Sequence, residues 1–478
     1  MRVARLELKD LGPFEDAALE IPPPADGQRG ELVLFEGPNG SGKTTIAQAL
    51  ACLATPPPVT DGVRGNASFP EMLYLRPEET GFALMPPLLE ILGRRRSKNA
   101  TVLANLEAGG ALFSPRIHEL GPSWPGDWHR NIPEAVRLIS GCAGAAGGRD
   151  EPLRWAAFAY QGHQPTPVVA TRGPGEIETP PLRGALSFGT FAPASADFGQ
   201  LLTNVNYEQA MAFMEAHKEG LPLDRREASQ RLAESRHAML ARMEEALSLA
   251  LDRAVRFDFP FGQHAPTVLV DGEAIALHLL GEGMRSTLSW LADLLVRLHR
   301  IPWASPEISP LEQDFWLILD EIDESLHPTM QMRILPTLRR LFPNARLYVT
   351  THSPFVVASA GEGYVFSIRP DRHHRVSGLI ESQQLEPGQS LEWVVEEVFG
   401  AETGFIDAYT RDALRAHRAD IHRMRRKEPF GDADWSAFLE RRAALMHLNE
   451  QVQTVVAMQE VPVQRAIDAR LAAAGEQA

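Results

Sequence analysis

Hydrophobic positions in the first 36 residues follow the two-residue period of β-strands. The segments RVARLEL and AALEI alternate apolar and polar side chains, which predicts half-buried strands. GELVLFE is a denser apolar run, typical of a buried central strand. The apolar segment TTIAQALACL then predicts a helix, which ends at the prolines that begin at residue 56.

The middle of the chain has a less regular pattern. Proline and glycine clusters predict an irregular insertion at about 60–150, and RWAAFAYQG (154–162) predicts another strand. Residues 224–255 predict one long amphipathic helix. Its apolar stripe consists of Leu232, Met239, Met243, Leu247 and Leu251. We interpret it as a packing helix, with a lever arm as the alternative.

Strands and helices alternate again in the second half. FWLILDE and ARLYVTT predict strands, and TMQMRILPTLRRLF between them predicts a helix, which indicates an α/β sheet covered on both faces. Beyond residue 376 the pattern is mostly helical. The predicted parts are a first lobe with its insertion, a helical insertion, a second lobe and a helical C-terminal region, at 1–195, 196–262, 263–375 and 376–478.

Composition narrows the class of protein. A hydrophobic fraction of 44% is enough for a sizeable core, and the net charge of −15 argues against a constitutive nucleic-acid coat. Two cysteines, Cys52 and Cys142, cannot build a disulfide framework and form no zinc pattern. No apolar run approaches the length of a membrane span, and the first residues lack a signal core. We therefore expect a soluble cytoplasmic protein with no membrane association.

The sequence GPNGSGKTT at 37–45 matches the phosphate-binding loop pattern between a strand and a helix. Its backbone N–H groups can surround phosphates, Lys43 adds a positive charge, and the Thr44 hydroxyl can ligate Mg²⁺. The predicted nucleotide-binding residues here are Gly37, Asn39, Gly40, Ser41, Gly42, Lys43, Thr44 and Thr45.

Two later strands end in further candidates for the same site. WLILDE places Asp320 and Glu321 at the carboxyl edge of the sheet, where Asp320 can hold Mg²⁺ and Glu321 can accept a proton from water. TTHSP follows the strand 32 residues further on, so His352 should emerge on the neighbouring strand and hydrogen-bond the γ-phosphate.

These motifs give the chain a resemblance to the ABC-type ATPase heads of SMC proteins, RecF and the OLD-family ATPases. It most closely resembles the compact bacterial AAA-family branch with OLD-like features. LILDEIDESLHP and QMRILPTLRRLFPNARLYVTTHSP carry the resemblance, which covers 1–55 and about 263–375 well. It implies an α/β P-loop NTPase fold with a mixed sheet flanked by helices, ATP and Mg²⁺ as cofactors, and a homodimer or higher homo-oligomer that sandwiches nucleotide between subunits.

The resemblance also implies a signature loop that contacts the γ-phosphate held by the partner subunit. HLLGEGMRSTLSWLADLL fits this loop, with Gly283 at the position of the family's glycine. Gly281 departs from the family, which has serine there, so one phosphate hydrogen bond is missing. Ser286 or Arg285 could supply the missing hydrogen bond to the phosphate instead.

Two more roles follow from the same resemblance. Gln161, with Gln164 close by, is the candidate for the glutamine that senses Mg²⁺ and the γ-phosphate. Asp323, Glu324 and Ser325 should form a loop that touches the partner subunit.

The resemblance leaves the biological role open. The interval between Gln161 and Gly281 has room for one helical hairpin, which excludes a long DNA-spanning arm. No nuclease pattern follows His352, so we expect a separate effector such as a nuclease or toxin. We favour the ATPase subunit of a bacterial anti-phage defence system. The alternatives are a RecF-like repair ATPase and a nucleotide-gated scaffold with negligible turnover. Nucleic-acid binding stays possible through two basic runs, Arg94, Arg95, Arg96 and Lys98, and Arg423, Arg425, Arg426 and Lys427.

Overall fold

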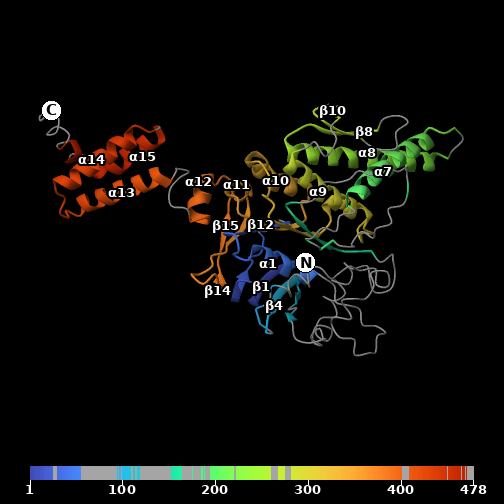
Figure 1. Cartoon of the computed structure of the whole chain (residues 1–478). Helices are drawn as coiled ribbons and strands as arrows, with labels where there is room; N and C mark the ends of the chain where they lie inside the picture. The colour runs from blue at the N-terminus through green and yellow to red at the C-terminus, as the bar shows by residue number, and fades with distance from the viewer. Residues whose placement is uncertain are drawn as a thin grey trace. The chain divides into compact units, whose positions relative to one another are not determined.

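The chain forms two compact units, Met1–Val394 and Val395–Ala478, in the computed structural model. The residues that the structure describes are 1–24, 30–54, 94–118, 152–163, 175, 185–186, 188, 194–219, 222–259, 267–274, 281–400, 408–448 and 450–470, without 95, 98, 109–110, 114–115, 465 and 469. Figure 1 shows the chain coloured from its N-terminus to its C-terminus.

The first unit contains a six-stranded sheet whose strands run in the order β15-β13-β3-β12-β11-β7. Neighbouring strands are parallel except for β15, which pairs antiparallel with β13. The strands are β3 (Glu31–Glu36), β7 (Ala156–Gln161), β11 (Phe315–Asp320), β12 (Arg346–Thr351), β13 (Gly363–Ser367) and β15 (Ser382–Leu385). Every residue of β3 and β11 is buried, as their continuous apolar sequences predict.

Helices cover this sheet (Figure 1). They are α1 (Lys43–Ala54), α9 (Glu282–Arg300), α10 (Pro328–Leu341) and α11 (Pro354–Ser359), and the short helix α12 (Leu391–Trp393) contacts α11. Alternate residues of each strand face opposite sides, as the two-residue period requires. Val33 and Trp316 join the core that contains α1. Phe315 instead contacts Phe342, just beyond the end of α10, with ring centroids 5.4 Å apart. The predicted α/β class with helices on both faces is confirmed.

A second sheet, in the order β14-β2-β1-β4-β5 with β6 beside β4, packs over α1. Its strands are β1 (Arg2–Leu11), β2 (Phe14–Glu20), β4 (Thr101–Ala108), β5 (Ala111–Phe113), β6 (Arg116–His118) and β14 (Val376–Ile380). Two expectations are corrected here. The interval 60–150 is not wholly irregular, because β4 is a regular strand paired with β1. The stretch after residue 376 begins with β14 and β15, short edge strands whose apolar signal is weak.

The predicted helical insertion is a hairpin of α7 (Ala194–Ala216) and α8 (Leu223–Leu251), which pack side by side (Figure 1). The apolar stripe of α8 is buried only toward its C-terminal end, since Met243 and Leu247 are covered while Leu232 is 44% exposed. A three-stranded sheet of β8 (Val255–Asp258), β9 (Thr267–Val270) and β10 (Glu273–Ala274) follows. A polar relay joins the hairpin to α9: Glu208 pairs with Arg236, whose Nη1 donates to His299 Nε2 at 3.0 Å.

Within its described residues, the second unit contains the helices α13 (Ala408–Arg425), α14 (Asp432–Met446) and α15 (Glu450–Glu460), with a short 3₁₀ turn after α15. Leu414, Leu445 and Val456 form part of its core. The core also contains His417, whose Nε2 donates to Glu460 at 3.1 Å. Among the described residues no helix is long and apolar enough to cross a membrane.

Candidate functional site

The predicted phosphate-binding loop connects β3 to α1 at the carboxyl edge of the parallel sheet. Gly40 and Gly42 have φ angles of 79° and 103°, in the left-handed region that glycine adopts most easily. Gly42 also has no room for a side chain, because a Cβ would lie 2.6 Å from Pro13 and from Phe14. The turn between β1 and β2 therefore covers the end of the loop.

Lys43 is 4% exposed and turns back onto the loop that precedes it. Its Nζ donates to the carbonyl oxygen of Gly37 at 2.8 Å and to that of Pro38 at 3.1 Å. Burial lowers the pKa of Lys43, and the negative charges of Glu321, Asp323, Asp320 and Glu36 oppose this shift. The ammonium is thus held against the phosphate loop, and the nearby carboxylates favour its charged form.

Asp320 ends β11 and is 1% exposed. The Thr350 hydroxyl donates to its Oδ1 at 2.6 Å, and the Thr44 hydroxyl also hydrogen-bonds this carboxyl. Burial raises the pKa of Asp320, while the two hydroxyls and Arg94 lower it. The structure therefore brings together Thr44 and Asp320, two of the three residues expected to hold Mg²⁺.

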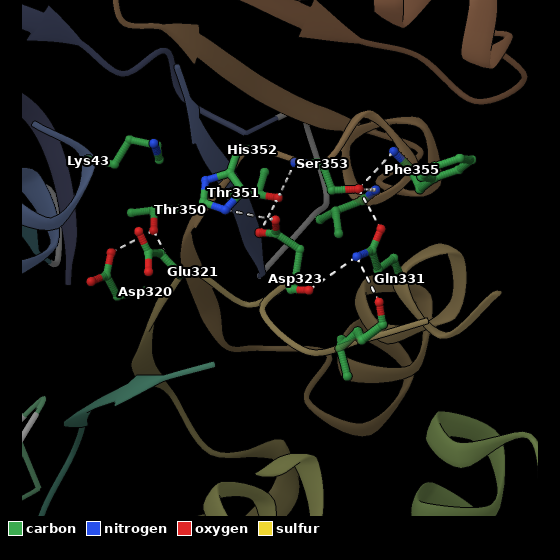
Figure 2. Close-up of polar contacts among 12 residues, drawn as sticks. Lys43, Asp320, Glu321, Asp323, Gln331, Thr350, Thr351, His352, Ser353 and Phe355 are labelled. Carbon is green, nitrogen blue, oxygen red and sulfur yellow. Dashed lines mark hydrogen bonds and ion pairs between the residues drawn. The ribbon is translucent and has the colours of Figure 1, made fainter. Parts of the chain in front are cut away.

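Glu321 follows in an unusual backbone conformation, with a φ of 53°. Two neighbours hold it there. Its N–H donates to Thr350 Oγ1 at 2.7 Å, and Gly162 packs directly against its carbonyl oxygen, where a Cβ would clash. A non-glycine residue at positive φ costs free energy and persists where its surroundings fix it, often at functional sites. Figure 2 shows Glu321, Asp320 and Lys43 grouped around Thr350.

His352 leaves the neighbouring strand β12, as predicted, and its side chain is 39% exposed. Its Nε2 lies 3.4 Å from Asp323 Oδ2 (Figure 2). The other carboxylate oxygen, Asp323 Oδ1, accepts from the Thr351 hydroxyl at 2.6 Å. The Asp323 side chain is therefore turned inward to the histidine loop, and contact of this segment with a partner subunit stays a prediction. Glu324 and Ser325 are exposed.

Gln331 of α10 ties this histidine loop to the segment after Glu321. Its Nε2 donates to the carbonyl oxygens of Asp323 and Leu326 at 3.1 and 3.0 Å, and its Oε1 accepts from the Ser353 hydroxyl at 2.7 Å (Figure 2). Ser353 in turn caps α11 by accepting from Phe355 N–H. The position of His352 is thus fixed from both sides.

Gln161 ends β7 directly beside Asp320, with which it pairs in the strand register. Gly162 N–H donates to the Asp320 carbonyl oxygen at 2.7 Å. This location fits the expected role of Gln161 near Mg²⁺. The alternative candidate, Gln164, lies outside the described residues.

The signature segment forms the N-terminal end of α9. Gly281 is exposed, and a Cβ there would meet nothing within 4 Å. Gly283 is buried against the Ser325 carbonyl oxygen. Ser286 is 1% exposed and donates to the Gly162 carbonyl oxygen, so its hydroxyl points inward. This corrects the suggestion that Ser286 replaces the missing serine, and Arg285 stays a prediction.

Three residues near the site were not found from the sequence. Thr350 connects Asp320 to Glu321, and Gly162 supports Glu321 from the other side. Arg369 makes a two-pronged ion pair with Glu36, the buried residue just before the phosphate loop, at 2.6 and 3.1 Å. Thr350 and Gly162 could have been found from the sequence, because they belong to the motifs TTHSP and AFAYQG. The pairing of Arg369 with Glu36 has no local sequence signal, because the two residues are far apart in the chain.

The residues present fit a nucleotide and Mg²⁺. The hydroxyl oxygens of Ser41 and Thr45 are fully buried and lack a hydrogen-bond partner among the described residues. Buried hydroxyls usually have partners, so these two indicate polar groups that are not part of the chain. Asn39 and Gly40 are exposed at the tip of the loop, where phosphates can reach their N–H groups.

Family models match two parts of the chain. Residues 1–54 match a model described as "AAA domain", and residues 190–358 match one described as "AAA domain, putative AbiEii toxin, Type IV TA system". These segments contain the phosphate loop and the Asp320 and His352 motifs, so the resemblance to AAA-family ATPases is confirmed.

Curated relatives match over limited segments. The chain is 31% identical to the Retron Ec83 probable ATPase of Escherichia coli over 31% of its own length and 27% of the relative's. It is 32% identical to the Retron Vc95 probable ATPase of Vibrio cholerae over 20% and 18%, respectively. It is 31% identical to the Septu protein PtuA of Bacillus thuringiensis over 32% and 39%. The matched segment thus spans less than half of each relative.

Solved structures show a distant likeness. An SMC head bound to the C-terminal winged-helix domain of ScpA matches with 13% identity and a TM-score of 0.39, covering 81% of this chain and 98% of that one. The SMC head domain from Thermotoga maritima matches with 15% identity and a TM-score of 0.35, covering 81% and 100%. At these scores the likeness supports no conclusion about function.

Proposed function

We propose that the chain is a Mg²⁺-dependent ATPase that hydrolyses ATP between two copies of itself. The observation that carries this proposal is the meeting of Lys43, Thr44, Asp320 and Glu321 at one sheet edge. Phosphate-binding and acidic residues from distant parts of the sequence converge there. The relatives described as probable ATPases support the same activity.

Each residue has a distinct task in this proposal. The N–H groups of residues 39–45 and the Lys43 ammonium bind the phosphates. To do so, Lys43 gives up its two hydrogen bonds to the loop carbonyl oxygens. Thr44, Asp320 and Gln161 would hold Mg²⁺, which when bound would neutralise charge on the β- and γ-phosphates.

Glu321 is the proposed general base, because its backbone is fixed and its carboxylate follows the Asp320 strand. His352 can hydrogen-bond the γ-phosphate or the attacking water while Asp323 orients its ring. In this arrangement the proton of the attacking water goes to the Glu321 carboxylate.

The proposal of a homodimer is based on the N-terminal end of α9. Gly281 and Glu282 are exposed at the N-terminus of α9, a 19-residue helix whose positive end favours an anion. We propose that this end contacts the γ-phosphate held by a second copy. The absence of a hydroxyl at 281 and the inward direction of Ser286 favour slow turnover, so a nucleotide-gated scaffold is the second candidate function.

The proposed biological role is control of a separate effector, such as a nuclease or toxin, in a bacterial anti-phage defence system. The similarity to a retron ATPase and to a Septu protein supports this role, because retrons and Septu are defence systems. The matched segments cover less than half of each relative, so the defence role is our proposal for this chain.

The test is ATP binding by calorimetry. Lys43→Ala should abolish binding, because the loop loses its charged side chain. Gly281→Ser, which the structure accommodates without a clash, should add a hydrogen bond to the γ-phosphate of the second copy. It should make the free energy of ATP-dependent dimerisation more favourable, or lower the activation free energy of hydrolysis, by about 1 kcal/mol. Unchanged ATP affinity of Lys43→Ala would overturn the nucleotide site, and unchanged dimerisation and turnover of Gly281→Ser would overturn the shared site.

A further inference from the structure

The second unit carries a row of basic residues on one face of α13. Arg415, Arg418, His422 and Arg425 are exposed and recur every three or four residues, so they lie on one side of the helix. Arg411 continues the same spacing one turn earlier in the sequence. The row from Arg415 to Arg425 extends about 15 Å along the helix.

Between Arg415 and Arg425 no acidic residue of α13 shares this face. Residues 408–427 contain seven Arg or Lys residues and two Asp residues, in a chain whose net charge is −15. Asp412 lies three residues before Arg415, at the start of the row, whereas Asp420 lies on another side of the helix and pairs with Arg423 and Arg441 at 3.5 and 2.7 Å. The row is therefore a local concentration of positive charge in an acidic protein.

The structure also shows which residues of the basic run do not belong to this face. Arg423, a candidate for nucleic-acid contact on sequence grounds, donates to Asp434 and to the Pro429 carbonyl oxygen. Its guanidinium also lies 5.0 Å from the centre of the Phe430 ring. Arg423 thus stabilises the turn between α13 and α14, whereas Arg418 and Arg425 face solvent.

We propose that this face of α13, defined by Arg415, Arg418, His422 and Arg425, binds the phosphate backbone of a nucleic acid. Arginine recognises phosphate with two parallel hydrogen bonds. One strand of a duplex carries a phosphate every ~3.4 Å along the axis, so a row of about 15 Å spans about four phosphates. The absence of apolar residues from the row fits backbone contact without base recognition.

A membrane surface fits this face less well. A helix that lies in a membrane interface inserts its apolar side, but in α13 the apolar residues Leu414 and Ile421 are buried in the core of the second unit. A protein interface would need a buried aromatic or aliphatic anchor, which the row does not provide. The charge pattern therefore favours nucleic acid.

The experiment compares three full-length proteins by fluorescence anisotropy with labelled duplex and single-stranded DNA of about 30 nucleotides. The test variant is Arg418→Gln/Arg425→Gln. The control is Arg225→Gln/Arg231→Gln, which removes the same charge from the exposed residues of α8. Calorimetry with ATP and circular dichroism check that nucleotide binding and folding are unchanged in both variants.

The wild type should bind DNA with an affinity that falls steeply between about 50 and 200 mM salt. The test variant should bind at least ~10-fold more weakly, and the slope of log affinity against log salt should fall by about 2. The control should match the wild type.

Three results would overturn the proposal. They are no DNA binding by the wild type at low salt, equal binding by the test variant and the wild type, or a loss confined to anionic phospholipid vesicles in a parallel sedimentation assay. Because ATP binding is measured separately, failure of this proposal is distinguishable from failure of the ATPase site.

Discussion

The Thr350 hydroxyl joins the two acidic residues of the site: it donates to Asp320 Oδ1 at 2.6 Å and accepts from Glu321 N–H at 2.7 Å. The first hydrogen bond gives the buried Asp320 carboxyl a partner, and the second holds the Glu321 backbone at its positive φ. Thr350 therefore acts as a positioning residue for the proposed metal ligand and general base.

Thr350→Val should slow hydrolysis about 10- to 100-fold, as expected for losing hydrogen bonds to a carboxylate and to a strained backbone. Thr350→Ser keeps the hydroxyl and should retain most of the activity. Steady-state kinetics should show the loss in kcat rather than in KM. Equal loss in both variants would mean that the methyl group, and not the hydroxyl, matters.

Gly162→Ala should slow hydrolysis strongly while ATP binding persists. A Cβ at this position would overlap the Glu321 carbonyl oxygen, so the general base must move. Gly431→Ala in the second unit is the matched control, since a Cβ at 431 would meet only an Asp434 carboxylate oxygen, at 3.9 Å. If Gly162→Ala hydrolyses ATP as fast as the control, Glu321 does not need its observed backbone position.

Stability of the first unit should fall as the pH decreases from about 6.5 to 4. Burial lowers the pKa of His299 to about 4, and the positive charge of Arg236 contributes. In this window the unfolded chain binds a proton that the folded chain excludes, so folding loses about 1 kcal/mol per pH unit. His299→Gln keeps an acceptor for Arg236 and should flatten the dependence of Tm on pH. A parallel fall in both proteins would assign the effect to other groups.

Much of the site could be predicted because its motifs are local. GPNGSGKTT and WLILDE each combine a buried strand with the residues that end it, and the sequence alone shows that combination. The direction of Asp323 and Ser286 could not be predicted, because tertiary contacts with Thr351 and Gly162 decide it. The strand β14 was missed since three of its five residues are exposed and its sequence, VSGLI, has little periodicity.

The unit boundary predicts how the chain tolerates truncation. A protein ending at Val394 should stay soluble and bind ATP, because it retains all of the first unit. A protein ending at residue 375 loses β14 and β15, including the buried Val376, Ile380 and Leu385. Burial of three such side chains is worth on the order of 5 kcal/mol, so this protein should unfold or aggregate. Thermal melts and soluble yield compare the two, and equal stability would contradict the assignment of these strands to the first unit.

The measurement that tests the central claim most directly is ATP turnover of Glu321→Gln beside ATP binding and size-exclusion chromatography of the same protein. Removal of a general base should slow hydrolysis at least ~100-fold while ATP affinity stays near that of the wild type. Because ATP is no longer consumed, the ATP-bound dimer should accumulate. Hydrolysis at the wild-type rate would contradict the account, and so would an ATP-bound protein that remains a monomer.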